Sequence, residues 1–143
     1  MKESDLGNML VQIATINNQL ANSDFLKGLS GDILSYTAVK LAAMKASILD
    51  LKVAAHEHLL EKEVELALSK GKAYAKYKAE HGSTAAGDMK YMDEDFIEAQ
   101  KEHNKAKVQY ERLKSVVADA HDTIESIRSR VIDLQGARRD ERN

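Results

Sequence analysis

The sequence predicts an all-α protein, a long antiparallel helical hairpin (a coiled coil) with a short N-terminal helix, which oligomerises. Three observations carry this prediction. The 143 residues contain no proline and only 5% aromatic residues, whereas sandwiches and barrels need turn residues about every ten positions. Apolar residues also recur with a helical period over long stretches. The length suits one domain, residues 1–143.

The longest periodic stretch predicts a helix over residues 92–138. Apolar or small residues return there at alternating gaps of three and four, so they occupy the a and d positions of successive heptads. These positions are Met92, Phe96, Ala99, His103, Ala106, Tyr110, Leu113, Val117, Ala120, Ile124, Ile127, Val131 and Leu134. A narrow seam of this kind is stable only when another helix covers it.

The partner is a second long helix predicted over residues 32–81, interrupted only by Gly71, which costs about 1 kcal/mol. One seam consists of Leu34, Thr37, Leu41, Met44, Ile48, Leu51, Ala55 and His58. A second stripe consists of Val39, Ala42, Ala46, Leu49, Val53, His56 and Leu60. Two stripes indicate two neighbours, the second being the N-terminal helix or another subunit. Beyond Leu60 the seam is expected to shift to Val64, Ala67, Gly71 and Tyr74.

A break at residues 81–91 separates the two long helices. Gly82 suits the position after a helix, and Asp93 is a candidate cap for the next one. An antiparallel hairpin with these ends places Gly71 opposite about residue 102. Each arm then measures on the order of 70 Å, too long for a compact monomer, and this length also favours oligomerisation.

The N-terminal helix is predicted over residues 4–22 and is followed by a loop that ends near Gly31. One face is apolar, with Leu6, Met9, Leu10, Ile13, Ile16 and Leu20. The other face is polar but uncharged, with Asn8, Gln12, Thr15, Asn17, Asn18 and Gln19. Such a helix can pack on its own hairpin or on another subunit, and the sequence leaves both open.

Composition and motifs argue against several function classes. The chain has no cysteine, which excludes disulfides and thiolate chemistry, and its net charge of -2 gives no general attraction to nucleic acid. No apolar run is long enough to cross a membrane and no signal peptide is recognisable, so we expect a cytoplasmic protein. No catalytic or phosphate-binding motif is present. His56 and His58 point about 200° apart on a helix and cannot share a metal. We therefore expect no enzyme, no cofactor and no metal.

The segment SKGKAYAKYK, residues 69–78, combines positive charge with aromatic rings and contains no acid. Lysines can neutralise phosphates and tyrosines can stack on bases, which is typical of single-strand binding. The candidate DNA-binding residues are Lys70, Lys72, Tyr74, Lys76, Tyr77 and Lys78. The alternative is a solvated face paired with Glu98 and Glu102 across the hairpin.

A possible second basic patch lies near the C-terminus, at Arg128, Arg130 and Arg138. Nearby carboxylates, that of Asp133 among them, reduce the net positive charge of this patch. Cations near the C-terminus of a helix are also favourable without any ligand.

Several short motifs of the chain resemble the phage recombination mediators called UvsY. The similar residues are Lys72-Ala73 with Tyr77 before a glycine-containing loop, then Val108-Gln109-Tyr110, Ile127-Arg128-Ser129-Arg130, Leu134-Gln135 and Arg138. The resemblance covers roughly residues 65–139 and departs from the family at Tyr74, where the family has a basic residue. It implies a ring-like homo-oligomer, a hexamer or heptamer, that binds single-stranded DNA. It also implies two protein partners, a RecA-like recombinase and the single-strand binding protein that the recombinase must displace.

Two other function classes stay open on the sequence. One is a structural or scaffolding coiled-coil protein, for which helical seams alone suffice. The other is a helical inhibitor or adaptor of a host protein. Salt-dependent binding of single-stranded DNA separates the mediator from both.

Overall fold

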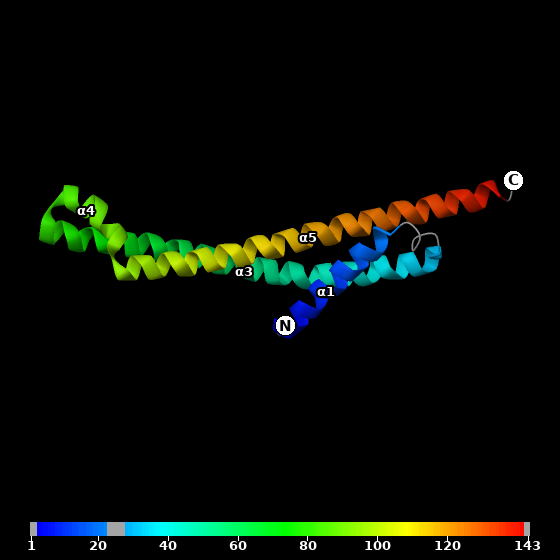
Figure 1. Ribbon diagram of the computed structural model, residues 1–143, viewed down its shortest axis with the longest axis horizontal. Coiled ribbons are helices and arrows are strands. Elements are labelled where there is room, and N and C mark those ends of the chain that lie inside the picture. Colours follow the sequence, from blue (N-terminus) through cyan, green and yellow to red (C-terminus); the bar gives the residue numbers. More distant parts are fainter. Residues whose placement is uncertain (1–2, 23–27, 142–143) are drawn as a thin grey trace. The chain divides into compact units, whose positions relative to one another are not determined.

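A computed structural model describes residues 3–22 and 28–141, and this part of the chain is helical without any strand. In chain order the elements are α1 (Glu3–Leu20), α3 (Gly31–His81), α4 (Ser83–Met89), the short 3-10 helix η1 (Lys90–Met92) and α5 (Glu94–Asp140) (Figure 1). The predicted all-α class is confirmed.

The helix ends follow local capping chemistry. Ser30 caps α3, since its hydroxyl accepts a hydrogen bond from the N–H of Ile33 at 3.3 Å. Gly82 ends α3 with a φ of 82°, a left-handed conformation that glycine adopts without strain. The break predicted after this glycine contains α4 and η1 instead of an open loop. Ala86 of α4 is completely buried, so tertiary packing stabilises a helix too short to persist alone.

The chain divides into two compact units, Met1–Asp50 with Lys114–Asn143 and Leu51–Leu113. We call them unit 1 and unit 2. Unit 1 contains α1, the beginning of α3 and the end of α5. Unit 2 contains the remainder of α3 and α5 together with α4 and η1.

The core of unit 1 forms where α1, α3 and α5 meet. Its fully buried large side chains are Leu34, Leu41, Ile48 and Ile127. The hydroxyl of Thr123 on α5 donates a hydrogen bond to the side-chain oxygen of Asn17, and Ile13 of α1 is buried. Met9, Leu10, Ile16 and Leu20 are half-buried, so the described part of this apolar face packs within its own chain, the first of the two alternatives left open by the sequence. The side chain of Leu6 lies outside the described ones.

In unit 2, the core contains both small and large apolar side chains. The buried ones are Ala55, Leu59, Ala73, Ala86, Phe96, Ala106 and Leu113. The ring of His56 stacks on Tyr110 with centroids 4.9 Å apart, and His103 Nε2 lies 3.8 Å from a carboxylate oxygen of Glu63. Within this unit, α3 and α5 therefore contact each other at several points along their length.

These contacts correct the predicted pairing of α3 with α5. His103 lies beside Glu63, whereas the predicted pairing sets Gly71 opposite about residue 102, a difference of about seven residues. The cause is η1, whose Lys90 and Tyr91 contact α3 where α5 was expected. In Figure 1, α4 lies beside the last turns of α3. A shift of about one heptad brings equivalent seam positions together, so the apolar pattern is preserved.

The burial pattern confirms most of the predicted seams. Every predicted seam position of α5 is buried or half-buried except Met92, which lies in η1 and is exposed. On α3 the predicted position His58 is exposed, and Leu59 takes its place in the seam. The shift expected in the second half of α3 is also wrong, because Val64 is 60% exposed and Ala73 is buried. After two successive gaps of four, from Leu51 to Ala55 and Leu59, the seam continues at gaps of three or four to Ala73.

The second predicted stripe of α3 is exposed in both units, and Val64 and Leu68 extend it. Its large members are Val39, Leu49, Val53, Leu60, Val64 and Leu68. Within each unit these side chains recur at helical spacing, so each unit exposes an apolar line along its part of α3. We call these two lines together the α3 stripe.

Candidate nucleic-acid interface

The candidate segment, residues 69–78, lies in the part of α3 that belongs to unit 2. Its four lysines are exposed and its two tyrosines are half-buried. Because residues four apart share a helix face, Lys70, Tyr74 and Lys78 lie on one side, and Lys72 and Lys76 on another. The predicted DNA-binding residues therefore divide between two faces.

Lys76 is occupied by a structural contact. Its ammonium donates a hydrogen bond of 3.2 Å to Oδ2 of Asp93, whose side chain is only 8% exposed. Oδ1 of Asp93 accepts hydrogen bonds from the N–H groups of Asp95 and Phe96, so Asp93 caps α5 as predicted. The hydrogen bond from Lys76, followed by that from the Phe96 N–H, lowers the pKa of Asp93. The same contact raises the pKa of Lys76.

Two residues that sequence reasoning missed join the candidate segment from η1. The ammonium of Lys90 lies 5.7 Å from the ring centroid of Tyr74 and 4.9 Å from that of Tyr91. The ammonium of Lys70 lies 5.6 Å from the centroid of Tyr91. We call Lys70, Tyr74, Lys90 and Tyr91 the basic-aromatic cluster. A signal for it existed in the sequence, because Lys90-Tyr91 repeats the pairing of Lys76-Tyr77 shortly before the cap.

The lysines outside the Lys76 contact carry unneutralised charge. Among the residues that the structure describes, no carboxylate forms an ion pair with Lys70, Lys72, Lys78 or Lys90. The alternative prediction paired the lysines of residues 69–78 with Glu98 and Glu102. In the structure both glutamates pair with lysines of α5. Glu98 pairs with Lys101 and Glu102 with Lys105, a contact that lowers the pKa of Glu102.

Tyr77 is the remaining predicted site residue, and it lies near the end of α3. Its ring stacks on His81 with centroids 6.5 Å apart, and the ammonium of Lys76 lies 5.1 Å from its centroid. Since Lys76 is held by Asp93, Tyr77 packs beside that ion pair and is not part of the basic-aromatic cluster.

The three arginines of the possible second patch do not gather on one surface of unit 1. Arg128 pairs with Glu125 at 2.6 Å and lines a groove with Ala42 of α3. Arg138 lies near the exposed end of α5. Arg130 instead lines a cavity of about 270 Å³ that also contains Leu20 and Leu34.

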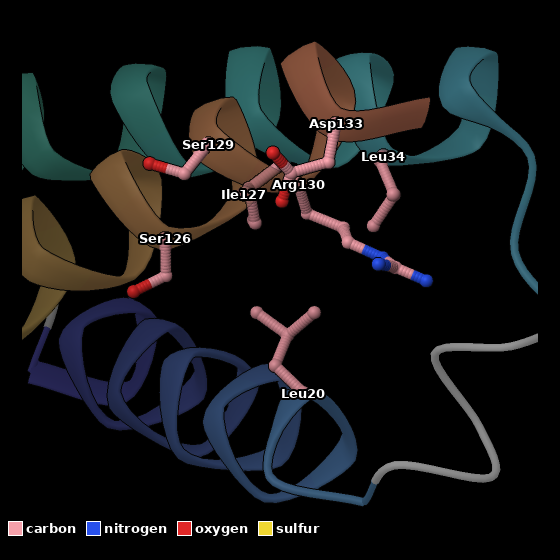
Figure 2. A pocket seen from close by; sticks show the side chains of 7 residues that line it. All are labelled: Leu20, Leu34, Ser126, Ile127, Ser129, Arg130 and Asp133. Atoms are coloured by element: carbon pink, nitrogen blue, oxygen red, sulfur yellow. The ribbon is translucent and has the colours of Figure 1, made fainter. Parts of the chain in front are cut away.

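The Arg130 cavity has one unsatisfied polar atom, since Nε of Arg130 is buried without a hydrogen-bond partner. Figure 2 shows its guanidinium group between Leu20 and Leu34, directed away from the hydroxyls of Ser126 and Ser129. The polar groups of the cavity therefore do not converge on one point, as an anion site requires.

The described residues contain no group of three side chains that could hold a metal ion. His56 and His103 both lie in contacts between α3 and α5. None of the helices described is long and apolar enough to cross a membrane. Comparisons with protein-family models, curated proteins and solved structures find no match to this chain.

Proposed function

We propose that the protein is a single-stranded-DNA-binding recombination mediator. In this role it helps to load a RecA-like recombinase, in the host cytoplasm, onto strands covered by single-strand binding protein. The observation that carries the DNA-binding part is the set of exposed lysines without carboxylate partners, Lys70, Lys72 and Lys78, of which Lys70 and Lys78 share a helix face with Tyr74. The resemblance to UvsY motivates the recombinase and the displaced protein as partners.

We further propose that α3 and α5 pair as an antiparallel hairpin and that hairpins associate into a ring. The contacts of His56 with Tyr110 and of Glu63 with His103 support the first part. The exposed α3 stripe supports the second, because a long apolar line on a helix is typical of contact with another helix. A ring would repeat weak phosphate contacts at high effective concentration and so raise the affinity for long strands.

A scaffolding role is the second candidate, and the same α3 stripe favours it. Self-association through the stripe needs no DNA, and Lys76 already has a structural partner in Asp93. The two functions differ in one property, which is whether the exposed lysines bind phosphates.

A titration of labelled single strands by fluorescence anisotropy tests the proposal. Affinity should rise with strand length, fall steeply with salt and depend little on sequence. Lys70→Gln with Lys72→Gln should flatten the slope of log affinity against log salt by roughly 0.7 for each phosphate that is no longer neutralised. The matched control is Lys40→Gln with Lys52→Gln, two lysines of α3 outside the candidate segment.

The control should bind with the parent's slope, because it has the same net charge as the test variant but keeps the candidate lysines. If the test variant also keeps the parent's affinity and slope while remaining folded, these lysines only solvate the surface. The scaffolding role would then be the better account.

A further inference from the structure

Tyr91 lies in η1 with half of its surface exposed and two ammonium groups close to its ring. We propose that Tyr91 is a stacking platform for one base of a single strand, with Lys70 and Lys90 binding the adjacent phosphates. This inference rests on the proposed function and names the group that recognises the bases. Neither Lys90 nor Tyr91 is part of the segment singled out in the sequence.

The orientation of the Tyr91 ring is fixed from the protein side. Phe96, which is 5% exposed, meets it edge to face with centroids 5.6 Å apart and planes inclined by 73°. Phe96 is anchored in turn, because its N–H donates to the capping carboxylate of Asp93. A ring held by a buried partner and still 52% exposed is preorganised, so a base stacking on it would cost little ordering entropy.

The charges around Tyr91 favour an anion. Lys70 and Lys90 come from different elements, yet both ammonium groups lie within 6 Å of the same ring centroid. Their repulsion is offset by the ring of Tyr91 and, for Lys90, also by the ring of Tyr74, while no described carboxylate pairs with either lysine. A single strand of DNA offers both kinds of partner at once. Its base can stack on the ring, and its phosphates can pair with the ammonium groups.

The chain contains no tryptophan, so Tyr91→Trp in the full-length protein places a single tryptophan at the platform, which can be excited selectively over the remaining tyrosines. Addition of an oligo-dT strand should quench its emission through stacking. An abasic strand of equal length should quench it much less, because it offers phosphates without bases. Tyr36→Trp is the matched control at an exposed tyrosine in unit 1, and its emission should not respond to either strand.

Binding by Tyr91→Ala provides a second measurement. Its affinity for oligo-dT should fall about fivefold or more, the loss expected for one stacked base, while its affinity for the abasic strand stays that of the parent. Tyr91→Phe should retain the parent's affinity for both strands, because the ring is kept. Tyr36→Ala should bind as the parent does.

Two outcomes overturn the platform. One is a parent that binds oligo-dT and abasic strands equally well. The other is a Tyr91→Trp variant whose tryptophan emission does not change while anisotropy reports binding. Failure of the proposed function looks different, since then neither strand binds the parent at all. A lowered melting temperature in Tyr91→Ala does not obscure the result, because the Tyr91→Trp measurement keeps an aromatic ring in place.

Discussion

Lys76 and Asp93, seventeen residues apart in the chain, are joined by a hydrogen bond of 3.2 Å. The carboxylate of Asp93 therefore has two roles, since one oxygen caps α5 and the other holds an ammonium group of α3. Lys76 is also one of the predicted DNA-binding residues, and this contact gives it a structural role. Its removal should alter stability first and binding second.

Asp93→Asn should lower the melting temperature at neutral pH, since asparagine keeps the cap but loses the charge. The pKa of Asp93 is lowered in the folded state. Its stabilising contribution is therefore present above the unfolded value of about 3.9 and lost as the pH falls through the lower folded value. The difference from the parent should accordingly shrink below about pH 4.

Thermal melts followed by circular dichroism at neutral and acidic pH check this dependence. Glu98→Gln is the control, because Glu98 and its partner Lys101 are both well exposed and contribute little at either pH. A constant difference between Asp93→Asn and the parent at all pH values would contradict the charge pairing.

Ile124→Asp should destabilise unit 1 by about 3–5 kcal/mol, because Ile124 is buried in the seam and a carboxylate there has no partner. Val108→Asp, at an exposed position of the same helix, should change the free energy of unfolding by less than about 0.5 kcal/mol. Chemical denaturation measures both. Equal stability of the two variants would show that the seam is assigned wrongly.

The same substitution should have opposite effects at two glycines. Gly82→Ala should cost about 1–2 kcal/mol, because its φ of 82° is unfavourable for a residue with a Cβ. Gly71→Ala should stabilise by about 0.5–1 kcal/mol, because Gly71 is exposed within α3 and an added methyl group would meet no atom within 4 Å. Urea denaturation of both variants against the parent tests the pair, and a loss of stability at Gly71 would argue against an uninterrupted α3.

Leu49→Glu with Val53→Glu should reduce the mass of the proposed oligomer, because two carboxylates in the α3 stripe oppose its burial against another subunit. Helicity should be retained, since both side chains are exposed in the single chain. Sedimentation equilibrium reports the mass, with Val11→Glu and Val108→Glu as a control pair off the stripe. A monomeric parent, or a variant with the parent's mass, would rule out this interface.

The helical seams could be predicted from the sequence because the period of an α-helix is a local property. Residues such as Phe96, Ala106 and Leu113 recur on one face whatever they pack against, and all three are buried. The cap at Asp93 was predictable for the same reason, since it depends only on the residues that follow it.

The pairing of α3 with α5 could not be predicted in the same way. A heptad pattern looks the same after a shift of seven residues, so Gly71 could be placed opposite several positions of α5 with similar apolar burial. The choice depends on particular contacts, among them Glu63 with His103 and Lys76 with Asp93. The sequence prediction of the basic-aromatic cluster was incomplete for a related reason. Lys90 and Tyr91 belong to η1, and only the folded chain brings them next to Lys70 and Tyr74 of α3.

The division into two units has a consequence for the order of folding. Unit 2 is one uninterrupted stretch, Leu51–Leu113, and its contacts of Lys76 with Asp93 and His56 with Tyr110 span 17 and 54 residues. Unit 1 needs both ends of the chain, and its contacts of Lys45 with His121 and Asn17 with Thr123 span 76 and 106 residues. Short loops cost less entropy to close than long ones, and a ribosome releases residue 113 before residue 121. The part that carries the candidate DNA site is thus the first able to fold, and the docking of α1 on α5 must wait for nearly the whole chain.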